Sequence, residues 1–426
     1  MIKKYGIKFA VLSTLLVSVG AQAAGFALIE QSASGMGNAF AGGSAAAEDA
    51  STIFFNPAGM TYINGTQAVG ALHLINPNAD FNDKGSVRAV PRPLGNEGPN
   101  AGDLAFVPNL YLMTDINSTI KLGLGINAPF GLKTEYDDKW IGRFQADKSE
   151  VKTININPSI AFKVNDQLSL GVGVSAMRAE ATLSRALNVG AAERSVEIKG
   201  NDWGFGFNLG AIYQATPDTR IGMAYRSKIN HTLEGKSKSN FTLLNANPLR
   251  TLNVDVTADV TLPENFSVSA FSRVNDTWDV MGDVTWTRWS QFKELKIVRD
   301  NGTKSTLALT PENWENTLRY SIGANYHYSD AIKLRAGLAY DQEAVKDQYR
   351  TARIPGNDRK WLSLGAGWQV TPASKLDVGY AHLFISDAKI DDDQRVVPGS
   401  PLGNGRVKGD FEGSVDILSL QYTHNF

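Results

Sequence analysis

Cysteine is absent from the 426 residues of the chain. Its absence excludes disulfide scaffolds, thiolate metal sites and cysteine nucleophiles, and it is compatible with maturation in an oxidising compartment without disulfide bonds. An excess of charge of one sign is also lacking, because 42 Lys and Arg are balanced by 43 Asp and Glu. A basic surface for nucleic acid is therefore not expected.

Motifs for metals, cofactors and catalysis are lacking as well. The five histidines are scattered without metal-ligand spacing, and the sequence has neither a phosphate-binding Walker loop nor a GxSxG nucleophile elbow. The glycine-rich segment 204–210 has some likeness to a nucleotide-binding loop, but its glycines fall within a strand pattern that no helix follows. We therefore expect no metal, no cofactor and no enzymatic activity.

Long hydrophobic runs are missing beyond the N-terminus, so the chain is not expected to cross a membrane as helices, which need ~20 apolar residues each. The hydrophobic content of 42% is ordinary for a soluble protein. A transmembrane β-barrel is still compatible with this composition, because each of its strands alternates between apolar and polar residues.

The N-terminus carries an export signal. Three lysines within the first eight residues precede an uncharged apolar run over residues 9–19 and the small-residue site Ala21-Gln22-Ala23. The run is too short for a membrane anchor helix, which is the alternative interpretation. We predict that residues 1–23 are a cleaved secretory signal peptide.

Residues 24–66 differ in composition from the rest of the chain, because Gly, Ala and Ser dominate them. This segment is too poor in bulky side chains to build a core of its own. It could be a flexible linker, but it also contains Phe40, Phe54 and Phe55 and the turn-forming sequence Asn56-Pro57-Ala58. We interpret it as a plug, or hatch, that packs inside another structure.

From residue 67 to residue 426, apolar and polar residues alternate with the period of a β-strand. At the C-terminal end, one strand face carries Leu418, Leu420, Tyr422, His424 and Phe426, and the other face is polar. Elsewhere, Lys333 and Arg335 or Lys375 and Asp377 lie opposite an apolar face. This pattern predicts strands with one apolar face and one polar face toward a solvated lumen.

The connections between these strands fall into two length classes. Six short turns lie near residues 115–118, 165–166, 216–218, 275–276, 329–330 and 371–374, and seven longer polar stretches cover approximately 76–106, 128–150, 181–199, 232–255, 290–314, 342–358 and 387–412. Thirteen connections predict an all-β fold, a 14-stranded antiparallel transmembrane β-barrel with both chain ends on the side of the short turns. Short periplasmic turns and long outer loops are typical of barrels in the outer membrane of Gram-negative bacteria.

Several short motifs, in their order and spacing, resemble the FadL-type family of outer-membrane long-chain fatty acid transporters along the whole mature chain. The resemblance implies a 14-stranded barrel closed by an N-terminal hatch, with substrate captured outside and released sideways through the wall into the membrane. The motifs that carry it are Ala24-Gly25-Phe26, Gly35-Met36-Gly37, Asn56-Pro57-Ala58, Val107-Pro108-Asn109, Pro129-Phe130-Gly131-Leu132, Trp203-Gly204-Phe205-Gly206, Tyr225-Arg226-Ser227, Leu262-Pro263-Glu264, Trp289-Ser290-Gln291-Phe292 and the C-terminal strand.

Two candidate ligand contacts follow from this resemblance. Arg185 matches the position at which the family holds the substrate carboxylate, and Phe26 matches a hatch residue that touches the ligand. The alternative for Arg185 is a solvated loop residue. The family's second cationic partner, a Lys in the fifth long loop, has no clean counterpart in the segment 304–310.

A candidate lateral gate lies at Pro129-Phe130-Gly131, because proline cannot donate to a strand ladder and interrupts the alternation there. In the family this place resembles an inward kink that opens a gap facing the hatch turn, here Asn56-Pro57-Ala58. The alternative is that Pro129 begins the second long loop.

The expected ligand is a long-chain fatty acid or another hydrophobic small molecule, and the expected surroundings are outer-membrane lipid around a monomer. Import of aromatic hydrocarbons, a surface barrel that acts as receptor or adhesin, and an outer-membrane hydrolase are the alternatives. A hatch beside an interrupted strand favours transport, because neither an adhesin nor a hydrolase needs a blocked lumen.

Overall fold

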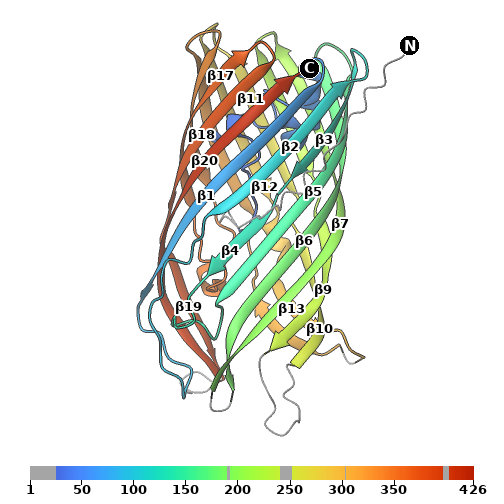
Figure 1. Cartoon of the computed structure of the whole chain (residues 1–426). Coiled ribbons are helices and arrows are strands. Elements are labelled where there is room, and N and C mark those ends of the chain that lie inside the picture. Colours follow the sequence, from blue (N-terminus) through green and yellow to red (C-terminus); the bar gives the residue numbers. More distant parts are fainter. Residues whose placement is uncertain (1–24, 190–191, 240–251, 303, 397–402) are drawn as a thin grey trace, which may run out of the picture.

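A computed structural model describes residues 25–189, 192–239, 252–302, 304–396 and 403–426, so the predicted signal peptide lies outside the described residues. The chain forms one closed, all-β barrel of fourteen antiparallel lines of strand (Figure 1). In chain order these lines are β1 (Gln67–Asp83), β2 (Ala105–Asp115), β3 with β4 (Ile120–Asn127, Gly131–Glu135), β5 (Lys148–Lys163), β6 (Leu168–Val189), β7 (Ala192–Thr216), β8 with β9 (Thr219–Arg226, Ile229–Ser239), β10 with β11 (Leu252–Leu262, Asn265–Arg273), β12 with β13 (Trp278–Thr287, Glu294–Arg299), β14 with β15 (Thr306–Pro311, Thr317–His327), β16 (Ile332–Asp341), β17 (Arg359–Thr371), β18 with β19 (Ser374–Ile385, Ala388–Arg395) and β20 (Gly403–Asn425).

The first and last strands close the barrel, since β1 pairs with β20 along its whole length from Gln67↔Asn425 to Asp83↔Gly409. Closure satisfies the backbone groups that an open edge would expose to lipid. The six predicted short turns all join consecutive strands at one end, where the C-terminus also lies (Figure 1). The predicted fold class and strand count are confirmed.

The long connections contain more strand than the sequence analysis predicted. The stretch 181–199 is not a loop, because β6 and β7 continue through it and pair as far as Val189↔Ala192. Shorter strands and 3-10 turns, among them η2 (Trp289–Gln291) and η3 (Asp347–Tyr349), occupy other long connections. Beyond the membrane both faces of a strand meet polar surroundings, so the hydropathy alternation fades while the backbone pairing continues.

The outer face of the barrel is apolar, as the alternation predicts. On β20, Leu418 and Leu420 are 48% and 53% exposed, whereas their neighbour Ser419 is fully buried. Such a surface is stable in lipid and costly in water. Within the described ranges, the structure has no helix that is long and apolar enough to cross a membrane.

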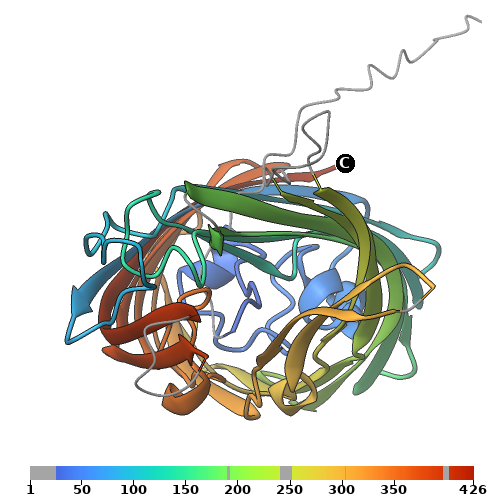
Figure 2. The same cartoon turned by 90° about the horizontal axis from the view of Figure 1, so that it is seen from below.

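The lumen is filled by residues 25–66, the segment called the hatch below (Figure 2). It contains the short helices α1 (Ala33–Met36) and α2 (Thr52–Phe55) and the 3-10 helix η1 (Pro57–Tyr62). Hatch side chains such as Met36 and Phe40 are buried against wall residues that include Trp361. The main hydrophobic core is therefore the contact between hatch and wall.

Glycines on the inner face of the wall allow the hatch to come this close. A Cβ at Gly171 would lie 2.3 Å from Ala58 N, and a Cβ at Gly365 would lie 2.6 Å from Gly37 Cα. These glycines give the hatch backbone room against the strands, which is a packing role.

Candidate ligand pocket and lateral gate

The wall is interrupted between β3 and β4. The ladder between β2 and β3 ends at Leu110↔Ile126, and β4 pairs with β5 alone. Residues 128–130 separate β3 from β4, and the fixed φ and missing N–H of Pro129 make a continuous strand unfavourable there. Within the described residues, the segment 105–109 of β2 thus has no partner strand of the wall on this side.

Residues 26–31 of the hatch, called the gate segment here, occupy this interruption. Leu28 N donates to Pro129 O at 2.7 Å, and Gly131 N donates to Phe26 O at 2.9 Å, so that Ala27 and Phe130 form an isolated antiparallel bridge. These bonds hold the gate segment to the Pro129-Phe130-Gly131 side of the interruption.

The β2 side holds the gate segment through side chains. Asn109 Nδ2 donates to Glu30 O at 2.9 Å, and the Tyr111 hydroxyl donates to Gln31 O at 3.2 Å. Gln31 Nε2 in turn donates to Ala128 O at 3.2 Å. All these hydrogen bonds of the closed gate join neutral groups. Each of them can therefore be exchanged singly for a hydrogen bond to water or to another neutral group.

The turn Asn56-Pro57-Ala58 lies elsewhere. Asn56 Nδ2 donates to Ala211 O at 3.0 Å and to Met223 O at 3.3 Å, which places the turn against β7 and β8. The expectation that this turn faces the Pro129 interruption is therefore corrected, because the gate segment fills that position.

An apolar cavity, called the outer pocket here, opens between the gate segment and the outer halves of β6, β7, β9, β10 and β13. Phe26 is one of its lining residues, and the contact of this hatch residue with a ligand stays a prediction. Most of its lining side chains are aliphatic or aromatic: Phe26, Leu132, Val151, Leu183, Ile198, Leu233, Val256, Leu262, Phe292, Leu295, Ile297 and Ile354.

Arg353 supplies the cation of this pocket. It comes from the long connection between β16 and β17 and lines the cavity. Its guanidinium donates to main-chain oxygens, among them Gln145 O at 3.0 Å and Lys148 O at 3.1 Å, and in the described part of the chain no carboxylate lies within ion-pair distance of it. A buried guanidinium without a counter-ion is a strong site for an anionic ligand.

Arg185 lies close to this cation and does not line the outer pocket itself. It is half-buried on β6, and its Nη1 donates to Phe144 O at 3.2 Å. Burial and the positive charge of Arg185 lower the pKa of Arg353 to about 10, which leaves both guanidinium groups charged at neutral pH. The two arginines together give the outer end of the pocket a strongly positive potential.

Two acidic residues line the same pocket: Glu180, which pairs with Arg178 at 3.0 Å, and Glu312. Glu312 Oε2 accepts a hydrogen bond from Trp314 Nε1 at 2.8 Å. Burial raises the pKa of Glu312 to about 7, so a large fraction of this carboxyl group is neutral at physiological pH. The field of Arg353 is therefore only partly compensated.

An aromatic cluster separates the outer pocket from a second cavity nearer the hatch. The Phe26 ring lies 4.9 Å from the Trp289 ring and 5.7 Å from the Trp314 ring, measured between centroids. The second cavity, called the inner cavity, is lined by the next gate residues, by Phe54 and Phe55 of the hatch and by Pro129 and Phe130 of the interruption. Displacement of Phe26 would therefore join the pocket to the gate.

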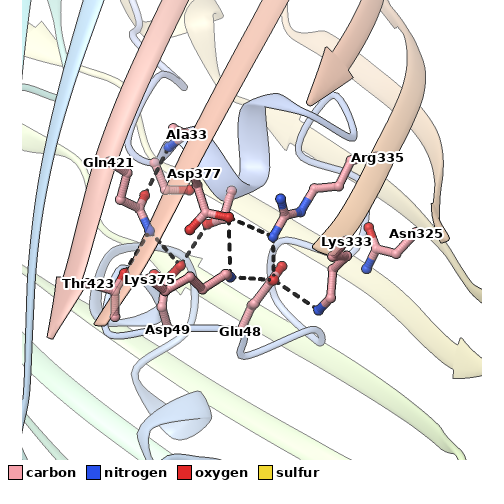
Figure 3. A network of polar contacts seen from close by, with 12 residues as sticks. Ala33, Glu48, Asp49, Asn325, Lys333, Arg335, Lys375, Asp377, Gln421 and Thr423 are labelled. Atoms are coloured by element: carbon pink, nitrogen blue, oxygen red, sulfur yellow. Dashed lines mark hydrogen bonds and ion pairs between the residues drawn. The ribbon is translucent and has the colours of Figure 1, made fainter. Parts of the chain in front are cut away.

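An ion cluster holds the hatch on another part of the wall (Figure 3). The carboxylate of Glu48 accepts from Lys333 Nζ at 3.0 Å, from Arg335 Nη2 at 2.5 Å and from Lys375 Nζ at 2.9 Å. Arg335 also pairs with the fully buried Asp377 at 2.9 Å. The predicted solvated lumen is wrong at this place, because these wall charges face the hatch carboxylate.

Sequence reasoning missed Arg353 and Glu312. Both residues belong to long connections that fold back into the barrel, and neither lies in a recognisable motif. Lys304, in the segment searched for a second cation, is exposed. A single Arg in a polar loop carries no sequence signal for an inward position, so a fold-back contact of this kind is visible in the structure alone.

Comparisons with known proteins assign the family. Residues 14–426 match the family described as "Outer membrane protein transport protein (OMPP1/FadL/TodX)". Outer membrane protein P1 of Haemophilus influenzae is 34% identical over 425 residues, which cover 89% of this chain and 90% of that protein. A long-chain fatty acid transport protein of Escherichia coli is 31% identical over 411 residues, which cover 89% and 91%.

Solved structures share the architecture. The crystal structure of a Pseudomonas aeruginosa FadL homologue has a TM-score of 0.85 at 28% identity, and the match covers 95% of this chain and 100% of that chain. The Pseudomonas putida toluene transporter TodX, at 16% identity and a TM-score of 0.67, shares the fold. The relatives and the apolar outer face place the protein in the outer membrane of a Gram-negative bacterium. Since the family match extends over nearly the whole chain, the protein belongs to the FadL/TodX family of outer-membrane transport proteins.

Proposed function

We propose that the protein is a passive transporter that takes up long-chain fatty acids, or similar hydrophobic molecules with an anionic end, and releases them sideways through the barrel wall. The observation that carries this proposal is the combination of two features: an apolar pocket lined by Arg353, which has no carboxylate partner among the described residues, and an interruption of the wall that the hatch fills. We propose no catalytic step, no cofactor and no metal.

The outer pocket fits both parts of a fatty acid. Burial of the alkyl chain contributes roughly 0.8 kcal/mol per methylene group, which the aliphatic lining provides. The carboxylate would accept charge-assisted hydrogen bonds from Arg353, with Arg185 adding to the positive potential. A role of Arg185 in direct binding stays a prediction.

The route continues through the gate. When the ligand fills the outer pocket, its tail competes with Phe26 for the aromatic cluster, and displacement of Phe26 pulls on the gate segment next to it. The gap between β2 and β4 then opens toward lipid. The hydrophobic gain on entering the bilayer makes the step downhill, so no ATP is required.

The domain organisation follows from this mechanism. We propose that residues 1–23 are removed on export, that residues 24–66 act as hatch and that residues 67–426 form the barrel. The barrel would work as a monomer surrounded by outer-membrane lipid, because each copy contains a complete pocket and gate.

Import of aromatic hydrocarbons is the second candidate, favoured by the aromatic cluster around Phe26. A neutral hydrocarbon gains nothing from Arg353, whereas a buried cation without a counter-ion lowers the stability of the empty pocket. The charge at this site therefore discriminates the two substrate classes.

The test compares substrates that differ in their anionic end. Cells without their own fatty acid transporter would express the wild type or Arg353→Met, and uptake of labelled palmitate, methyl palmitate and toluene would be measured. Wild-type uptake should favour palmitate, and Arg353→Met should lower palmitate uptake about tenfold while that of methyl palmitate changes little. Arg395→Met, at a pair with Asp393 outside the lining of the outer pocket, serves as control. Palmitate uptake by Arg353→Met that equals that of the wild type would contradict the proposal. Uptake of toluene alone would favour the hydrocarbon function.

A further inference from the structure

His231 is a polar residue in the apolar part of the outer pocket. It lies on β9, lines the cavity and is 3% exposed. Its strand neighbours in the pocket lining, Leu233 on β9 and Val260 opposite it on β10, are aliphatic. A His at this position needs a polar partner, because burial removes its contacts with water.

One ring nitrogen of His231 has a partner and the other has none. Nδ1 lies 3.3 Å from Asp202 Oδ2, an oxygen that also accepts from Thr232 N at 3.1 Å. A carboxylate selects the tautomer with the proton on Nδ1. Nε2 therefore presents a lone pair, and among the described residues no group donates to it.

The pairing of the strands places His231 far from the arginines. Arg353 donates to Ser184 O near the outer end of β6. Ser184 is paired with Glu197 of β7, and Glu197 is paired on its other side with Lys238 of β9, so Lys238 marks the level of Arg353 on β9. His231 lies seven residues before Lys238, which corresponds to about 23 Å along an extended strand. His231 thus belongs to the deep end of the pocket, at a separation comparable with the length of an extended long-chain fatty acid.

We propose that the outer pocket binds hydroxylated long-chain fatty acids, and that His231 Nε2 accepts a hydrogen bond from a hydroxyl group on the distal half of the chain. This inference rests on the proposed function and specifies its substrate class. An acceptor nitrogen requires a ligand O–H, so a keto group or a plain methylene at the same position leaves Nε2 unpaired.

A purely structural role of His231 is the competing explanation. A Cβ at Gly204 of β7 would lie 2.7 Å from His231 Cε1, so the imidazole fills space beside that strand. Phe has a ring of similar size and lacks the acceptor. His231→Phe therefore keeps the packing and removes the lone pair.

The experiment measures competition binding to purified protein in detergent micelles, with stearate, 17-hydroxystearate, 3-hydroxystearate and 17-oxostearate as probes. The wild type should bind 17-hydroxystearate about tenfold more tightly than stearate or the two other probes. His231→Phe should lose this preference, so that its affinities for the hydroxylated probe, the oxo probe and stearate become alike. Val260→Ala, which enlarges the same region without a polar change, should weaken all four probes alike.

Two results would overturn the inference. These are equal binding of 17-hydroxystearate and 17-oxostearate by the wild type, or a hydroxyl preference that persists in His231→Phe. Absence of saturable stearate binding would contradict the transport proposal itself and the inference with it. The stearate measurement thus distinguishes a failure of the transport proposal from a failure of the role of His231 alone.

Discussion

At the scale of single residues, the positive charges at the outer pocket are only partly neutralised by nearby carboxylates. Arg353 and Arg185 are cations without a carboxylate in ion-pair contact within the described ranges. Of the two acidic residues that line the pocket, Glu180 pairs with Arg178 at 3.0 Å, whereas Glu312 has no cation at ion-pair distance among the described residues. An anionic ligand and ionised Glu312 compete for the same positive field. Ligand binding is therefore coupled to the protonation of Glu312.

This coupling predicts a pH dependence. Because burial raises the pKa of Glu312 to about 7, the carboxyl is mostly neutral at pH 6 and mostly ionised at pH 8. Hexadecanesulfonate, which stays anionic throughout, should bind about 3 to 10 times more weakly at pH 8 than at pH 6, as measured by isothermal titration calorimetry. Two other charged groups act on Glu312. Arg353 stays positively charged over this pH range. Burial raises the pKa of Asp392 to about 6, so this carboxyl also becomes more negative toward pH 8 and weakens anion binding in the same direction.

The matched variant is Glu312→Gln, which keeps the shape of the side chain and removes its charge. Binding by Glu312→Gln should be stronger at pH 8 than in the wild type and should vary less with pH. A wild-type affinity that is the same at pH 6 and pH 8 would contradict the role of Glu312.

At the scale of elements, the hatch is attached in two different ways. The gate segment is held by neutral hydrogen bonds to β2 and to the Pro129 interruption, whereas Glu48 is held by three cations from β16 and β18 (Figure 3). Neutral contacts can be exchanged one at a time, but a buried ion cluster has to be broken together. We therefore expect the gate segment to be the part of the hatch that moves and the Glu48 region to be its anchor.

Weakening of the anchor should loosen the whole hatch. Glu48→Gln leaves Lys333, Arg335 and Lys375 with one carboxylate fewer, and we expect a loss of about 3 kcal/mol in the free energy of hatch unfolding. In planar bilayers the variant should show current bursts that the wild type lacks. Asp391→Asn, which breaks an exposed pair with Arg406, should stay silent. Glu48→Gln without bursts and with wild-type stability would contradict the anchor.

At the scale of the whole molecule, the barrel was predictable because its determinants are local and repeated. Alternation along each strand and the short turns between strands are visible in any window of sequence. They were sufficient to predict the number of strands and the closed barrel. The interruption at Pro129 was predictable for the same reason, because the chemistry of proline is local.

The contacts that build the site were not predictable in this way. Arg353 reaches the outer pocket from a connection more than 150 residues away from its partner Ser184, and the gate segment bonds to residues about 100 positions later in the chain. The register between such segments depends on side-chain packing inside the lumen. The same holds for the turn Asn56-Pro57-Ala58, whose sequence predicts a turn but not the strands that it faces.

Lateral release depends on departure of the gate segment from the wall, and a reversible cross-link tests this step most directly. The bridge Ala27↔Phe130 is of the type in which the side chains of an antiparallel pair lie closest, so a disulfide between Ala27→Cys and Phe130→Cys is geometrically allowed. The chain has no other cysteine to interfere. A second pair, Ser44→Cys with Ser269→Cys, would link the hatch to β11, where the two hydroxyls are 2.7 Å apart.

The measurement is fatty acid uptake by cells that carry each cysteine pair, under oxidising conditions and after reduction. We predict that the oxidised Ala27→Cys/Phe130→Cys pair abolishes uptake and that reduction restores it, while the Ser44→Cys/Ser269→Cys pair transports in both states. Undiminished uptake with the first pair fully oxidised would contradict lateral release through this gate.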